Sequence, residues 1–195
     1  MTCIVGLVHD GVAYIGGDSL CSNGHLKSLR EDLKVFRLKN THSSVLGFTT
    51  SYRMGQLLMY AEDLIDEECT INHEYMVTEF IPKVREVLSS GGFIGSGDYE
   101  GGQFIVANEV TIYEIDSDNQ VSVHSNGLYS VGCGQEFALG SLHTTRDTNL
   151  TPKERIFKAL EAAQEFSVGV QAPFYIMNTA NNDIEWSGNI EKTTT

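Results

Sequence analysis

Apolar residues fall in short runs separated by turn residues over much of the chain, a pattern typical of antiparallel strands. The pair Asp10-Gly11, for example, favours a tight hairpin turn between two such runs. The segment 19–32 is polar and irregular, and we expect no regular element there. The predicted strands cover residues 2–8, 12–18, 34–38, 44–49, 103–107, 110–115, 121–124, 174–177 and 183–186.

Other stretches are predicted to be helical, and the longer ones repeat apolar residues every three or four positions, which gives a helix one buried face. The predicted helices cover residues 51–65, 76–88 and 135–142 and a stretch that follows Thr151. Pro82 predicts a kink in the second helix or a later start. The last helix has the clearest signal, because Thr151 is an N-cap, Pro152 takes the first helical position and Glu154 completes a capping box.

The order of these elements is strands, two helices, strands, two helices and strands, without the regular alternation of a parallel fold. It favours an α+β fold in which antiparallel sheets are covered by helices. A length of 195 residues, 41% of them hydrophobic, suits one domain over residues 1–195 with a full core. We expect the glycine-rich segment 91–102 to be a flexible connection, because no Gly-Lys-Ser/Thr follows it. The Thr-rich end, residues 191–195, is expected to be disordered.

Composition and charge argue against several classes of function. The formal net charge of −13 and the lack of a basic stripe disfavour nucleic-acid binding. No stretch approaches the roughly 20 apolar residues of a membrane helix, and no secretory signal opens the chain, so we expect a cytoplasmic protein without membrane contacts. The four cysteines and six histidines lack the spacing of metal ligands, so we expect free thiols, no metal and no cofactor.

The candidate chemistry lies at the N-terminus. Initiator methionine is normally removed before a small residue, and Thr2 would then carry both a hydroxyl and a free α-amine. Such a residue is a nucleophile with its own base, because an α-amine titrates at about pH 7.7–8.0 and can take the hydroxyl proton. Taken alone, Thr2 is better explained as a small residue tolerated near an N-terminus. The neighbouring Cys3 points to the other side of its strand and is expected to be a buried core thiol.

Asp18 and Lys34 strengthen the hypothesis of a threonine nucleophile. Asp18 ends an apolar strand after two glycines, so its side chain is expected to be partly buried, and Lys34 begins the next predicted strand. A buried Lys-Asp pair beside Thr2 would lower the pKa of its amine and stabilise an alkoxide-like transition state. The alternative is an ordinary structural salt bridge, or two solvated side chains.

At these residues the chain resembles a known family. The opening of proteasome β-type subunits, and most closely that of the bacterial HslV-type peptidase, is similar to residues 2–6, to Gly17-Asp18 and to residues 34–38. The family's strand before its first helix, its Gly-Ser-Gly element with the helix after it, and a helix near its C-terminus resemble residues 45–48, 132–140 and 158–163. The likeness therefore extends over almost the whole chain.

This resemblance implies an N-terminal-nucleophile hydrolase with a four-layer αββα sandwich of two antiparallel sheets flanked by helices. It implies Thr2 as nucleophile and base, with Asp18 and Lys34 as the charge pair that tunes it. It further implies a homo-oligomeric ring that hydrolyses peptides or unfolded proteins inside a closed chamber. Such rings often work with a separate ATP-dependent unfoldase, which would be a partner of this chain.

The chain departs from the family pattern at three places. Cys133 stands where the family has serine, and Thr50 stands where its oxyanion segment has glycine. Ser167 is preceded at three residues by Gln164, where proteasome subunits have aspartate. The predicted catalytic residues are therefore Thr2, Asp18, Lys34 and Cys133, and the predicted oxyanion and substrate contacts are Thr49, Thr50 and Cys21.

Two competing hypotheses follow from these departures and from the fold. The first is a non-catalytic ring or scaffold subunit, which Cys133, Thr50 and the missing carboxylate favour. The second is an amidohydrolase of the same fold that acts on a small amide. A retained Met1 would block the Thr2 amine and would favour the first of them.

Overall fold

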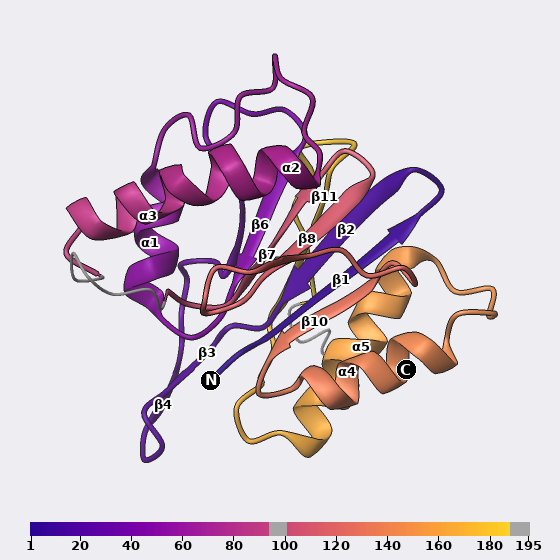
Figure 1. The fold of residues 1–195 in the computed structure, drawn as a ribbon. Helices are drawn as coiled ribbons and strands as arrows, with labels where there is room; N and C mark the ends of the chain where they lie inside the picture. The colour runs from indigo at the N-terminus through magenta and orange to yellow at the C-terminus, as the bar shows by residue number, and fades with distance from the viewer. Residues whose placement is uncertain (94–100, 188–195) are drawn as a thin grey trace, which may run out of the picture.

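The strands form two five-stranded antiparallel sheets and one short hairpin in a computed structural model that describes residues 1–93 and 101–187 (Figure 1). The first sheet has the order β10-β1-β2-β11-β12, with β1 Cys3–His9, β2 Val12–Gly17, β10 Leu128–Gly132, β11 Phe174–Asn178 and β12 Glu185–Ser187. The second has the order β5-β6-β7-β8-β9, with β5 Val35–Arg37, β6 Ser44–Phe48, β7 Phe104–Asn108, β8 Thr111–Ile115 and β9 Val121–Ser122. The hairpin pairs β3 (Leu20–Ser22) with β4 (Lys27–Leu29).

Helices lie against both sheets, one group on each (Figure 1). The group on the second sheet consists of α1 (Tyr52–Tyr60), α2 (His73–Tyr75), the π-helical turn η1 (Met76–Phe80) and α3 (Ile81–Ser90). The group on the first sheet consists of α4 (Gln135–Thr144) and α5 (Pro152–Phe166). The prediction of antiparallel sheets covered by helices is confirmed.

Buried apolar side chains form three clusters, one between the two sheets and one between each sheet and its helices. Strand β1 contributes to two of them because its side chains alternate between its faces. Its residues Cys3, Val5 and Leu7 pack toward α4 and α5, whereas Ile4 packs between the sheets. Thr2, two residues before Ile4, therefore lies on the side of β1 that faces the second sheet.

Two expectations about regular elements are wrong. The segment 19–32 contains the hairpin β3–β4, which sequence patterning missed because β4 is exposed throughout and carries no apolar alternation. The first helix ends at Tyr60, because Ala61 already has extended backbone angles. Leu64 and Ile65 are nevertheless buried, so their helical spacing reflects burial after the helix has ended.

The second helical segment begins earlier than predicted and contains a π turn. Asn72 caps it, accepting a hydrogen bond from the Tyr75 N–H at 2.9 Å. The π turn η1 then precedes Pro82, which lies in the first turn of α3. A proline has no N–H to donate, and the wider π turn lets the helix continue through this position.

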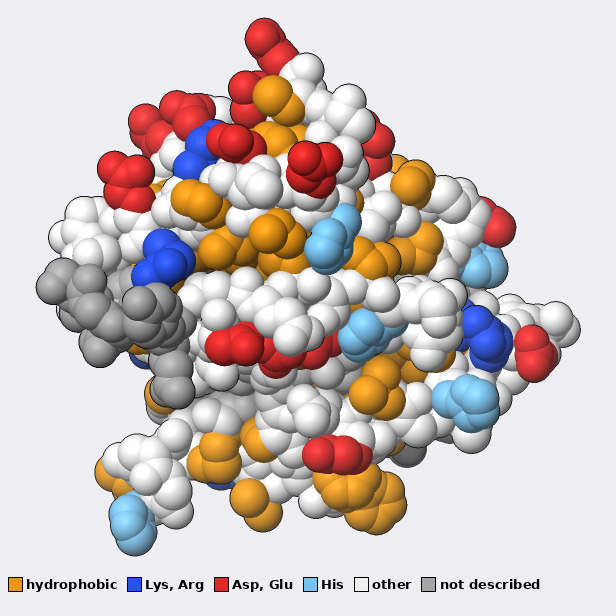
Figure 2. All heavy atoms as spheres, in the orientation of Figure 1, with side chains coloured by type: hydrophobic (Ala, Val, Ile, Leu, Met, Phe, Trp, Pro, Cys, Tyr) orange, Lys and Arg blue, Asp and Glu red, His pale blue; other side chains and the backbone are white. Residues whose placement is uncertain are grey.

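Charge is distributed unevenly over the surface. Figure 2 shows acidic side chains gathered over the end of the molecule that holds α2 and α3, where the chain supplies Glu62, Asp63, Asp66, Glu67, Glu68, Glu74 and Glu79. Within the two described ranges, no helix has the length and apolar character needed to cross a membrane. The predicted connection 91–102 lies largely outside the described residues, and the end 191–195 lies wholly outside them.

Candidate active site

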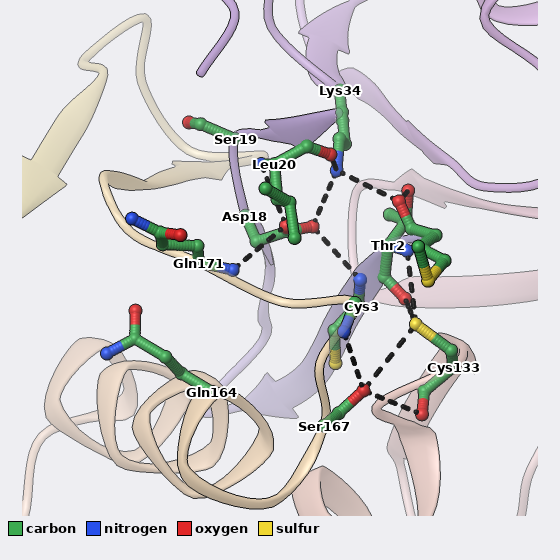
Figure 3. Close-up of polar contacts among 12 residues, drawn as sticks. Thr2, Cys3, Asp18, Ser19, Leu20, Lys34, Cys133, Gln164, Ser167 and Gln171 are labelled. Atoms are coloured by element: carbon green, nitrogen blue, oxygen red, sulfur yellow. Dashed lines mark hydrogen bonds and ion pairs between the residues drawn. The ribbon is translucent and has the colours of Figure 1, made fainter. Parts of the chain in front are cut away.

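The four residues predicted as catalytic lie together where β1 begins (Figure 3). Thr2 is only 3% exposed. Its backbone N–H donates to Cys133 Sγ at 3.3 Å, and the Cys133 thiol donates in return to the Thr2 carbonyl oxygen at 3.3 Å. Cys133 therefore holds the backbone of the candidate nucleophile on both sides.

A buried ion pair stands beside Thr2 (Figure 3). Lys34 Nζ donates to Asp18 Oδ1 at 2.8 Å and to the Leu20 carbonyl oxygen at 2.7 Å. The Asp18 carboxylate also accepts three backbone N–H groups, those of Cys3, Leu20 and Gln171, at 3.0, 3.0 and 3.3 Å. The same carboxylate thus fixes the ammonium and the strand that starts next to Thr2.

The electrostatics of Lys34 reflect two opposing effects. Burial lowers the pKa of Lys34 below its ordinary value, while the adjacent Asp18 carboxylate favours the charged form. A desolvated ammonium held at a fixed place is well suited to stabilise negative charge that develops nearby. Cys3, in contrast, is fully buried and burial raises its pKa to about 12, so it is a neutral core thiol.

The sheets explain how residues far apart in the sequence meet. The β1–β2 hairpin brings Asp18 to β1, where its N–H donates to the Cys3 carbonyl oxygen at 3.3 Å. Strand β10 pairs with β1 so that Gly132 lies opposite Cys3. Gly132 has a φ of 100°, and a Cβ there would lie 2.3 Å from the Thr2 carbonyl oxygen. Only glycine tolerates both the positive φ and the close approach to the Thr2 carbonyl oxygen. Gly132 therefore allows the chain to place Cys133 beside Thr2.

The predicted oxyanion and substrate residues lie on the second sheet and on the hairpin. The Thr49 N–H donates to the Gln103 carbonyl oxygen at 3.0 Å. Thr50 has a φ of 75°, a conformation that favours glycine, and its N–H has no partner among the described residues. Cys21 lies in β3, close enough to act electrostatically on Lys34.

Ser167 and several main-chain groups also contact residues of the site. Ser167 Oγ donates to the Cys133 carbonyl oxygen at 3.3 Å, whereas the Gln164 side chain accepts the Ala172 N–H at 2.7 Å. Gln164 therefore does not replace the aspartate that the family has there. The Leu20 carbonyl and the Gln171 N–H were missed because main-chain groups have no signature in the sequence.

The carbonyl group of Met1 lies within the candidate site, between Thr2 and Lys34. Its carbonyl oxygen accepts a hydrogen bond from Thr2 Oγ1 at 2.5 Å and lies 3.5 Å from Lys34 Nζ. While the Met1–Thr2 bond is intact, the Thr2 nitrogen is an amide and cannot serve as a base. Amine chemistry at Thr2 therefore requires removal of Met1.

The four cysteines are free thiols, as predicted, and they differ in exposure from the fully buried Cys3 to the exposed Cys69 and Cys133. Within residues 1–93 and 101–187, no group of three or more histidine, cysteine, aspartate or glutamate side chains is placed to hold a metal ion.

Comparison with solved structures identifies the fold. The protein BPH from Thiobacillus denitrificans, in complex with epoxomicin, has a TM-score of 0.77 and 19% identity over 93% of this chain and 100% of its own. Eukaryotic HslV from Trypanosoma brucei has a TM-score of 0.66 and 19% identity over 91% of this chain and 98% of its own. The chain has an HslV-like fold. The Anbu (Gly-1) mutant from Hyphomicrobium sp. strain MC1 shares it, with a TM-score of 0.72 and 11% identity over 98% of this chain and 89% of its own.

This HslV-like fold confirms, at the level of structure, the resemblance drawn from the sequence motifs. Sequence comparison alone finds no matching protein family and no similar curated protein.

Proposed function

We propose that this chain is a threonine-nucleophile peptidase of the proteasome-β and HslV-like group of N-terminal-nucleophile hydrolases. The observation that carries the proposal is the buried Lys34–Asp18 pair beside Thr2. Its ammonium lies 3.5 Å from the oxygen of the Met1 carbonyl group, whose carbon is bonded to the Thr2 nitrogen. A positive charge so close to a residue with a hydroxyl and a latent amine is the activation scheme of such enzymes. The two sheets and their helices would form a single four-layer αββα domain.

The proposed reaction begins once Met1 has been removed and Thr2 carries a free amine. The amine takes the proton of the Thr2 hydroxyl while Oγ1 attacks the carbonyl carbon of the substrate peptide bond. The amine then returns the proton to the leaving nitrogen, the C–N bond breaks, and an ester remains on Thr2. Water attacks this ester with the amine again as base, and the proton returns to Oγ1 as the carboxylic acid leaves.

The charged pair and one backbone N–H would stabilise the intermediates. Lys34 would offset the negative charge at Oγ1, with Asp18 holding its ammonium in place. We assign the oxyanion donor to Thr50, because the Thr49 N–H is already bound to Gln103. The Thr49 side chain and Cys21 would form the walls that the substrate meets. Cys133 would orient the Thr2 nitrogen, its present hydrogen-bond partner.

We further propose that the chain assembles into a homo-oligomeric ring in the cytoplasm. Its substrate would be a peptide or an unfolded protein, delivered by a separate ATP-dependent unfoldase. The likeness to HslV and to BPH, which was solved with epoxomicin, supports this proposal.

Labelling with a peptide epoxyketone tests the proposal. A hydroxyl adds to the ketone of this probe and a neighbouring amine opens its epoxide, so one residue must present both groups. We expect the intact mass to lack Met1, and we expect one adduct that maps to Thr2 and stops peptide hydrolysis. Thr2→Ser should keep label and turnover, whereas Thr2→Ala should abolish both and leave the oligomer, measured by native mass spectrometry, unchanged. Turnover by Thr2→Ala, or labelling of another residue, would contradict the assignment.

The second candidate is a non-catalytic ring or scaffold subunit. The Met1 carbonyl already accepts the Thr2 hydroxyl and lies against Lys34, so a chain that keeps Met1 has a filled site. An assembled protein that retains Met1 and takes no label would support this candidate. An amidohydrolase would instead take the label and cleave small amides while leaving peptides intact.

A further inference from the structure

Tyr52, which lies outside the residues assigned so far, contacts the groups that hold Lys34. Its hydroxyl donates to the Leu20 carbonyl oxygen at 3.2 Å, and the same oxygen accepts Lys34 Nζ at 2.7 Å. The centroid of its ring lies 5.9 Å from Lys34 Nζ. This distance is within the range in which an ammonium is attracted to an aromatic face. Tyr52 is thus a neighbour of Lys34 through both its ring and its hydroxyl.

The ring of Tyr52 is held firmly in this place. The Arg30 guanidinium stacks over it at 4.2 Å from the centroid, and Asp32 binds that guanidinium through two hydrogen bonds. Phe48 meets the ring edge-on, with 5.9 Å between centroids. Tyr52 is also the first residue of α1, whose N-cap is Ser51. Burial raises the pKa of Tyr52, so the phenol stays protonated and remains a donor at neutral pH.

We propose that Tyr52 is a positioning residue that shields the Lys34 ammonium from water and thereby strengthens its field at Thr2. This inference rests on the proposed function of Thr2. The physical reason is that water entering beside an ion raises the effective dielectric constant and weakens its interaction with neighbouring charges. A well-shielded Lys34 disfavours the protonated form of the Thr2 amine more strongly, so a larger share of that amine is neutral and able to act as a base.

Other titratable groups also face Lys34. Asp18 from the end of β2 makes the ion pair, and Cys21 in β3 and Cys133 before α4 act on the ammonium at longer range. Asp32, in the loop before β5, interacts with Lys34 as well and is itself bound to Arg30. None of these groups is removed when Tyr52 alone is replaced. A change in Lys34 titration in such a variant therefore reports on Tyr52.

Three variants separate the contributions of the ring and of the hydroxyl. Tyr52→Ala removes both, and Tyr52→Phe removes only the hydroxyl. Tyr60→Ala is the matched control, because Tyr60 is 68% exposed at the other end of the same helix. If Tyr52→Ala does not fold, Tyr52→Val exposes the ammonium in a similar way and replaces it in both measurements.

The first measurement follows the titration of Lys34 by NMR in protein labelled at lysine Cε, and it needs no enzymatic activity. We expect the pKa of Lys34 to rise by about half a unit or more in Tyr52→Ala, because water reaches the ammonium and relieves its desolvation. Tyr52→Phe and Tyr60→Ala should titrate like the wild type. An identical Lys34 titration in wild type and Tyr52→Ala would overturn the proposal, even if activity fell.

The second measurement is the pH dependence of kcat/KM for a fluorogenic peptide. Its acid limb reports the Thr2 amine, and we expect it to move to higher pH in Tyr52→Ala while Tyr52→Phe keeps the wild-type limb. A purely structural role would lower the rate without moving the limb, and that result would count against the proposal. If no variant, wild type included, hydrolyses peptides while the Lys34 titration still shifts, the shielding stands and the peptidase assignment fails.

Discussion

Asp18 binds both Lys34 and the backbone N–H of Cys3, the residue after Thr2. We therefore expect Asp18→Asn to lower both the free energy of unfolding and the peptidase activity. The change leaves the Lys34 ammonium buried without its counter-charge, and breaking a buried pair in this way costs about 3–5 kcal/mol. Urea unfolding followed by circular dichroism should show the loss of stability. Peptide hydrolysis should be lost as well, because Lys34 would no longer be held in its charged form.

The pair formed by Arg30 and Asp32 provides the control for that prediction. Its side chains are 31% and 38% exposed, and an exposed ion pair contributes about 0–1 kcal/mol to stability. Asp32→Asn should therefore lower the free energy of unfolding far less than Asp18→Asn. If Asp18→Asn and Asp32→Asn lowered the free energy of unfolding equally, burial of the Lys34–Asp18 pair would not be the reason for its contribution to stability.

Residue type and position in a strand made Thr2, Asp18 and Lys34 candidates, and the resemblance to the proteasome β-type and HslV-type family gave them their predicted roles. Each is a polar residue at the end of an apolar run, where a side chain meets the edge of the core. Tyr52 could not be found in this way, because its role depends on how the start of α1 lies against the Leu20 carbonyl. Contacts to main-chain atoms depend on the arrangement of elements, which a residue pattern does not encode.

Among the elements, Glu67 connects the segment between α1 and α2 to the turn between β5 and β6. Its carboxylate accepts hydrogen bonds from the His42 N–H at 2.8 Å and the Ser43 N–H at 3.0 Å. The Ser43 hydroxyl donates to it as well, at 3.1 Å. Partial burial raises the pKa of Glu67, but these hydrogen bonds outweigh that effect and hold its pKa below the ordinary value. The folded protein therefore favours the ionised form.

Stability should accordingly depend on pH through Glu67. The contribution of its carboxylate is complete above the ordinary pKa of 4.5 and is lost as the pH falls through the lower pKa of the folded state. Glu67→Gln should lower the free energy of unfolding at pH 7 by about 1 kcal/mol. It should also reduce the further loss between pH 5 and pH 3, both measured by urea unfolding. Glu68→Gln, at the exposed neighbouring position, should leave the pH dependence unchanged, and a matching change there would refute the role given to Glu67.

The elements that the sequence predicted best are those with a periodic buried face or a cap. The capping box of Thr151 and Glu154 is present at the start of α5, as predicted. The hairpin β3–β4 was missed because it exposes most of its side chains. The end of α1 was missed because Leu64 and Ile65 continue the apolar spacing after the backbone has become extended. Periodicity thus records which side chains are buried, and only indirectly the backbone that buries them.

For the whole molecule, the geometry of the candidate site depends on how closely the two sheets pack. Hairpins follow from local turn signals, but the stacking that brings Lys34 of one sheet to Asp18 of the other has no local signal in the sequence. Gly47 in β6 lies at this contact. A Cβ there would lie 2.6 Å from Ile4 Cγ2 and 2.9 Å from Ile15 Cγ2, both on the first sheet.

Gly47→Ala should therefore push the sheets apart at a point near the candidate site. Overpacking of a tight core costs about 1–3 kcal/mol, and the Lys34–Asp18 contact should loosen with it, so we expect lower thermal stability together with lower peptidase activity. Gly140→Ala in α4 is the matched control, because a Cβ there meets nothing within 4 Å and alanine is the better helix former by about 1 kcal/mol. Differential scanning calorimetry and peptide hydrolysis measure the two effects. If Gly47→Ala had the same thermal stability and the same peptidase activity as Gly140→Ala, the spacing of the sheets would not determine the geometry of the site.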